Sequence, residues 1–99
     1  MKLQVGHTVK LKISCLGNSA GTIGIVVEAY VLGDRYGYMV LFENGNYDGF
    51  SEEDEVDNFL EVFGVCEPLS TYRFTNVMKL TQDFQHGWFD VVLKERQVF

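Results

Sequence analysis

The chain has 99 residues, 46% of them hydrophobic and 14% aromatic, and its 14 acidic residues outnumber 8 basic ones to give a net charge of −6. This composition is typical of one globular domain and differs from that of disordered or fibrous chains. Because nucleic-acid phosphates and anionic membranes are bound through Lys and Arg, the acidic balance argues against both partners. No run approaches the roughly 18 apolar residues of a membrane helix, and the first residues lack an apolar signal core, so we expect a cytoplasmic protein.

Two strands are predicted in the first third of the chain. Apolar and polar residues alternate over residues 8–13, with Val9 and Leu11 on one side, and this is the period of a β-strand. Residues 15–21 are small or turn-forming and predict a loop. The alternation resumes over residues 22–31 and predicts a long second strand.

Gly33 and Asp34 end that strand, and a third strand follows. Its inward-facing row is expected to be Tyr36, Tyr38, Val40 and Phe42. Asn44 and Gly45 come next, and an Asn-Gly pair between alternating apolar residues predicts a type I′ hairpin turn, which needs positive φ at both central residues. Residues 47–51 are expected to form a short fourth strand.

Apolar residues also occupy the predicted face of the second and third strands that points away from the interior. These residues are Val26, Tyr30, Leu32, Met39 and Leu41. An apolar outer face of this size requires a cover. We expect the C-terminal part of the chain to supply it, with a second subunit as the alternative.

The segment after the fourth strand predicts a helical turn and a last strand. Ser51 is followed by four acidic residues, which favours a single helical turn because acids interact well with the positive end of the helix dipole. Leu60 and Val62 then begin a fifth strand that ends near Pro68. Five short strands in this order resemble an SH3-like (Src-homology-3-like) small barrel, an all-β fold.

Over about residues 5–67 the chain resembles the photosystem I reaction-centre subunit IV type of this barrel. The matching residues are Val40-Leu41-Phe42-Glu43, Asn46-Tyr47, Gly49-Phe50-Ser51, Asn58-Phe59 and, in the second strand, residues 21–27. The resemblance implies the fold of a five-stranded SH3-like barrel. That family is described as a basic docking surface for an acidic electron carrier, whereas this chain is acidic and continues well past the matching region.

Residues 69–99 form a C-terminal extension of the barrel at residues 1–68, and we expect the two to make one compact domain. The density of Thr, Tyr, Phe and Val predicts that the extension is a β-hairpin. The alternative is a helix, because Leu80 and Phe84 lie at helical spacing and Gly87 is a suitable C-cap. In either form the extension is expected to pack on the outer face of the barrel.

Aromatic residues near the turns and one acidic segment are the candidate binding residues. SH3-like barrels often bind extended ligands through aromatic surfaces, and this indicates Tyr36, Tyr47 and Phe50. The concentrated negative charge comes from Glu52, Glu53, Asp54, Glu55 and Asp57. We interpret this segment as a solvated helix start and, alternatively, as a patch that meets a basic partner.

No motif predicts catalysis, a metal or a cofactor. A partial match to a calcium-binding loop is made by Asn44, Asn46, Asp48, Gly49 and Glu55. The preceding segment is a predicted strand and not a helix, so this match predicts a hairpin turn and no metal site. Cys15 and Cys66 form no C-x-x-C motif, although the strands that they flank are expected to pair.

These observations predict a non-catalytic binding module, or a small subunit of a complex, that recognises a protein or a peptide. The alternative is an acidic inhibitor or immunity-type protein that occupies a basic site such as a nuclease active site. A homodimer is a further expectation if the apolar outer face is left uncovered.

Overall fold

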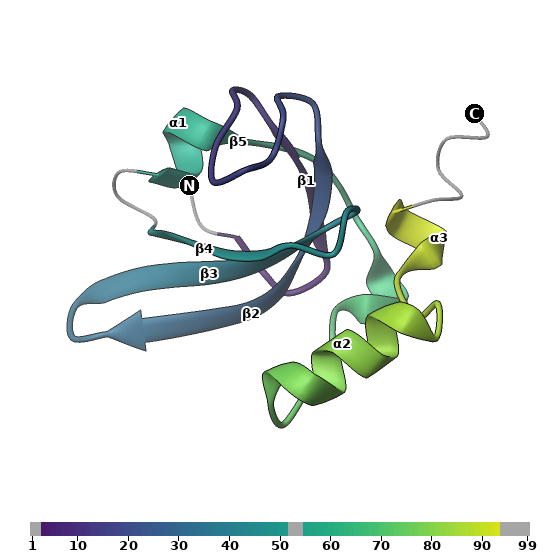
Figure 1. Cartoon of the computed structure of the whole chain (residues 1–99). Coiled ribbons are helices and arrows are strands. Elements are labelled where there is room, and N and C mark those ends of the chain that lie inside the picture. The colour runs from purple at the N-terminus through teal and green to yellow at the C-terminus, as the bar shows by residue number, and fades with distance from the viewer. Residues whose placement is uncertain (1–2, 52–54, 94–99) are drawn as a thin grey trace.

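The computed structural model describes residues 3–51 and 55–93, without the side chain of Leu32. Its strands form a five-stranded antiparallel sheet in the order β4-β3-β2-β1-β5 (Figure 1). The strands are β1 (His7–Leu11), β2 (Ile23–Leu32), β3 (Arg35–Phe42), β4 (Tyr47–Ser51) and β5 (Leu60–Val65). The expected all-β fold is confirmed: β5 lies next to β1, and β4 and β5 are the two edges of a small barrel-like sheet.

One side of the sheet holds the inner core. This core consists of Leu3, Val9, Leu11, Val26, Tyr38, Val40, Phe42, Phe50, Val56 and Leu60. Tyr38, Val40 and Phe42 alternate along β3, so the predicted inward row of that strand is correct from Tyr38 onward. The rings of Phe42 and Phe50 meet edge to face with centroids 6.1 Å apart, which is a favoured arrangement of aromatic pairs.

The C-terminal extension is helical, so the β-hairpin prediction is wrong and the helix alternative is correct. Its elements are the 3-10 helix η2 (Glu67–Leu69), α2 (Val77–Gln85) and α3 (Asp90–Leu93), while the short α1 (Asp57–Phe59) precedes β5. The side chain of Asn76 caps α2 by accepting a hydrogen bond from the Lys79 N–H at 2.9 Å. Gly87, with φ +85°, ends the helix in the left-handed conformation that favours glycine. No helix in the described ranges is long and apolar enough to cross a membrane.

The helices cover the outer face of the sheet and build a second, outer core, as expected for the extension. The fully buried members are Ile23, Ile25, Val27, Leu41, Leu69, Tyr72, Leu80, Phe89, Val92 and Leu93. Leu80 of α2 and Val92 of α3 belong to this core because a helix gathers its apolar residues on one side. This packing need outweighs the strand propensity on which the hairpin prediction was based.

A β-bulge exchanges the two faces of β2 in the middle of the strand. The register with β3 shifts between Val26 and Glu28, so that an extra residue, Val27, enters β2. Before the bulge Val26 points into the inner core, and Ile25 points into the outer core. The prediction that Val26 lies on the outer face is therefore wrong.

The turn at Asn44-Gly45 also differs from its prediction. Of these two residues only Gly45 has positive φ, at +90°. The Gly45 N–H donates to Phe42 O at 2.8 Å and the Phe42 N–H donates to Asn46 O at 2.8 Å, which closes a three-residue loop. Such a loop needs one left-handed residue, whereas a type I′ turn needs two.

Candidate functional site

The second half of β2 has a backbone edge that no strand of residues 3–51 or 55–93 pairs. β1 pairs with β2 only from Lys10 opposite Ile23 to Thr8 opposite Ile25. The Gly6 N–H then donates to Val26 O at 2.9 Å. Beyond Val26, no backbone hydrogen bond from the described part of the chain reaches this side of β2. Figure 1 shows the β2–β3 hairpin extending past the other strands, with this edge of β2 uncovered along the outer half of the hairpin.

The register identifies which groups of β2 point outward. Leu32 and Arg35 flank the two-residue turn Gly33-Asp34, in which Gly33 alone has positive φ, as in a type II′ turn. Residues of an antiparallel pair alternate between positions that exchange hydrogen bonds with the partner and positions that do not. With Leu32 in the bonded set, the N–H and C=O groups of Ala29 and Val31 point away from β3.

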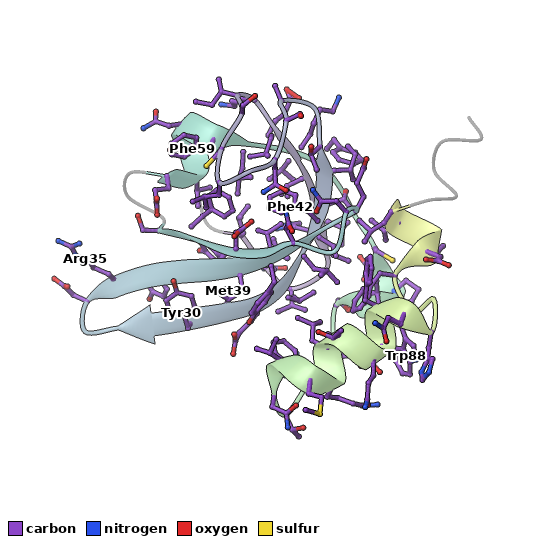
Figure 2. All side chains as sticks on the ribbon, viewed as in Figure 1. Tyr30, Arg35, Met39, Phe42, Phe59 and Trp88 are labelled. Atoms are coloured by element: carbon purple, nitrogen blue, oxygen red, sulfur yellow. The ribbon has the colours of Figure 1, made fainter. Side chains whose placement is uncertain are left out.

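The side chain of Tyr30 leans away from this edge. A Cβ atom on Gly37 would lie 2.3 Å from Tyr30 Cζ, and one on Gly49 would lie 3.6 Å from the Tyr30 hydroxyl oxygen. The ring therefore lies across β3 toward β4, over two positions that have no side chain. Figure 2 shows Tyr30 on the hairpin between Met39 and the hairpin end that carries Arg35. The free edge is left open as a result.

A cleft of about 290 Å³ lies at the base of the edge. It is lined by Val5, Val27, Glu28, Ala29, Arg73 and Phe74. β2 supplies three of these residues, and the segment between η2 and α2 supplies Arg73 and Phe74. Its size is near the lower end of ligand pockets, which suits a few side chains of an extended segment.

An aromatic and acidic wall borders this cleft. The Tyr47 hydroxyl donates to Glu28 Oε1 at 3.3 Å, and the Tyr47 ring meets Phe74 edge on with centroids 6.2 Å apart. Burial, and then the neighbouring Glu28 charge, raise the pKa of Tyr47 to about 12, so the phenol keeps its proton at neutral pH. The Tyr47 hydroxyl therefore acts as a hydrogen-bond donor to Glu28 at the cleft.

Two opposite charges line the cleft. Arg73 is exposed and donates from Nη1 to its neighbour Tyr72 O at 2.7 Å. Within the described ranges Arg73 and Glu28 form no ion pair with each other. The cleft thus offers both a guanidinium and a carboxylate to a bound segment.

The structure distributes the predicted binding residues over different places. Tyr47 borders the cleft, and Tyr36 is 40% exposed opposite Val31 near the hairpin end. Phe50 is 1% exposed in the inner core, so its side chain is not available to a partner. Glu52, Glu53 and Asp54 lie outside the described residues.

The two acidic residues that follow are described. Glu55 Oε1 accepts the Ser51 N–H at 2.8 Å, and Asp57 is exposed on α1. Neither reaches the cleft lining. The predicted aromatic and acidic residues therefore do not form one continuous site in the described chain.

Sequence reasoning missed Glu28, Arg73, Phe74 and the backbone of β2. The length of β2 was a usable signal, because a ten-residue strand beside a five-residue one must leave part of its edge unpaired. The position of Arg73 was not predictable, because it depends on how the extension folds back on the sheet.

The residues that partly match a calcium-binding loop form hydrogen bonds around the β3–β4 turn. The Asn44 and Asn46 side-chain amides each donate to Asn18 Oδ1 at 2.7 Å. The Asn18 amide in turn donates to Asp48 Oδ2 at 3.0 Å. No group of three or more metal-binding His, Cys, Asp or Glu side chains occurs among the described residues.

Cys15 and Cys66 are free thiols. Cys15 packs against the inner core and Cys66 against the outer core. They therefore lie on opposite sides of the sheet, although β1 and β5, which they follow in the chain, pair with each other.

Comparisons of the chain with protein-family models, with curated proteins and with solved structures give no significant match. The resemblance to the photosystem I subunit IV type therefore stays a prediction. The function is argued below from the geometry of the chain itself.

Proposed function

We propose that the protein is a non-catalytic binding module that takes up an extended segment of a protein along the free edge of β2. The observation that carries this proposal is the edge of β2 facing away from β3, which no strand of the described chain pairs beyond Val26, together with the charged cleft at its base. In strand addition, main-chain hydrogen bonds supply affinity and pockets for alternate side chains supply specificity. Here Ala29 and Val31 offer the main-chain groups, and the cleft offers the pocket.

The composition of the edge supports a binding role. Long edge strands are usually protected from pairing by Lys, Pro or an inward charge. Residues 27–32 contain neither Lys nor Pro, and their single charge, Glu28, lies at the cleft. Val31 is 58% exposed. An open apolar edge of this kind favours pairing with another strand.

The acidic-inhibitor alternative depends mainly on Glu52, Glu53 and Asp54, which lie outside the described residues. We therefore base the proposal on the β2 edge. Free Cys15 and Cys66 suit a reducing compartment, and we place the activity in the cytoplasm.

A pair of lysine substitutions tests the proposal. Val31→Lys puts a charge on the free edge, whereas Val77→Lys changes a valine of similar exposure, 53% against 58%, at the start of α2. The probe is a displayed library of short linear peptides selected on the wild-type protein. We expect the selected peptides to bind wild type and Val77→Lys equally and Val31→Lys about tenfold more weakly or worse.

Two results would count against the β2 edge. One is a selection that enriches no peptide when it is run at a protein concentration at which the chain is monomeric. The other is a set of peptides that bind Val31→Lys as tightly as wild type. Thermal unfolding of both variants checks that each keeps the wild-type fold.

A further inference from the structure

We infer that the segment which pairs with β2 is β2 of a second copy of this chain, so that two sheets join into one across a twofold axis. This inference rests on the proposed function, because it names the occupant of the same edge. It is argued from the register of the hairpin, the place where the free edge ends and the charges at its two ends.

The register of β2 allows an antiparallel self-pairing with Tyr30 opposite its own copy. Ala29 of each copy then lies opposite Val31 of the other. These are the two residues whose N–H and C=O groups point outward, so each Ala29–Val31 pair can exchange both hydrogen bonds. Both side chains are exposed on the same face of the sheet, and this pairing buries them against each other.

The ends of the hairpin fit the ends of the free edge in this register. Val27 lies opposite Gly33 of the second copy. The next position, Val26, already accepts a hydrogen bond from Gly6 and has no place for another strand. The second copy turns away at this point, because Gly33 and Asp34 are its hairpin turn.

Opposite charges meet at each end of the paired strands. The turn of one copy brings Asp34 beside the cleft that carries Arg73 on the other. Arg35 of the incoming copy shares an outer-face row with Glu28, because Arg35 pairs with Leu32 and Leu32 lies opposite Glu28. Twofold symmetry repeats both contacts. The charges that line the cleft are thus complementary to those of the hairpin end.

The twofold arrangement also explains how an open strand edge avoids uncontrolled addition of further strands. In an isologous dimer the same surface patch of each copy is used once, and the contact closes. The joined sheet has the order β4-β3-β2-β2-β3-β4, with both β2 edges paired. Neither copy keeps a free β2 edge for further addition.

The test measures the molar mass of the intact protein by sedimentation equilibrium over a range of concentrations. We expect wild type and Val77→Lys to form dimers and Val31→Lys to be monomeric. A charge exchange gives a second test that does not disturb the strand: Asp34→Arg alone weakens dimerisation about tenfold, and combining it with Arg73→Asp restores it.

The outcomes separate the inference from the proposed function. A monomeric wild type, or a dimer that Val31→Lys leaves intact, overturns the self-pairing. Failure of the Arg73→Asp exchange to restore the Asp34→Arg dimer overturns the register. Selected peptides that still require Val31 would then keep the proposed function, with a foreign segment as the occupant. A wild-type protein that is monomeric and that also binds no selected peptide would refute both proposals.

Discussion

Asp83 shows how a single charge is held in the outer core. Asp83 is 2% exposed, and its Oδ2 accepts a hydrogen bond from the Tyr72 hydroxyl at 2.7 Å. Oδ1 lies 3.0 Å from Lys79 Nζ as an ion pair, without the angles of a hydrogen bond. Burial alone raises the pKa of Asp83, but the Tyr72 hydrogen bond and the Lys79 charge outweigh it and leave this pKa below its ordinary value.

The pH dependence of stability follows from that direction. A lowered pKa in the folded state means that Asp83 stabilises the protein above its unfolded pKa of about 4, and that this contribution is lost as pH falls through the folded value. We expect Asp83→Asn to lower the free energy of unfolding at neutral pH by about 1–3 kcal/mol. The difference from wild type shrinks in acid, as measured by urea unfolding from neutral pH downward.

Glu67→Gln is the matched control, because Glu67 is exposed on η2. Its unfolding curve is expected to stay close to wild type at each pH. A constant gap between wild type and Asp83→Asn at all pH values would show that Asp83 does not titrate as described.

At the scale of elements, the buried side chain of Asn18 links the β1–β2 loop to the β3–β4 turn by hydrogen bonds. Asn18 lies in the β1–β2 loop, is 3% exposed, and bonds to Asn44, Asn46 and Asp48 around the β3–β4 turn. The loop and the turn are distant in sequence, and these hydrogen bonds join them. Burying this amide unpaired would be costly, and three of its partners are polar side chains around one hairpin turn.

Asn18→Ala tests this tie. Removing the Asn18 side chain leaves the amides of Asn44 and Asn46 and the carboxylate of Asp48 without this partner. We expect the free energy of unfolding, measured by urea titration, to fall by about 1–3 kcal/mol. Asn46→Ala removes a single one of these bonds from an exposed position and is expected to cost less. Equal losses in the two variants would contradict a central role for Asn18.

The strands could be predicted from the sequence, but the direction of the side chains in β2 could not. Alternation placed β4 at residues 47–51 and Tyr38, Val40 and Phe42 in the core. The bulge at Val27 was hidden, because residues 25–27 are all apolar and give no sign of which residue is extra. The extension carried both strand and helix signals, and its contact with the sheet decided between them.

The candidate site was less predictable because it depends on contacts between segments that are distant in the sequence. Tyr47 was identified beside its turn, whereas the cleft around it is assembled from β2 and the extension. Phe50 was predicted for binding from its residue type and proved to be core. The unpaired edge is a property of strand pairing, which a local pattern of residues does not encode.

At the scale of the whole molecule, the helices and the hairpin divide the outer face between them. α2 and α3 cover the half of the sheet that carries Ile23, Ile25 and Leu41. The end of the β2–β3 hairpin extends past this cover (Figure 1). A second copy that joins at β2 meets this uncovered half, so the homodimer that we infer uses a strand edge and not the covered apolar face.

Amide hydrogen exchange at Ala29 and Val31 tests the central claim most directly. These amides exchange freely when the β2 edge is open and slowly when a strand is paired with it. We predict that their exchange slows as the protein concentration rises, or when a selected peptide is added, while amides that β3 already pairs change little. Fast exchange at both positions under every such condition would contradict the account of β2 as a recognition edge.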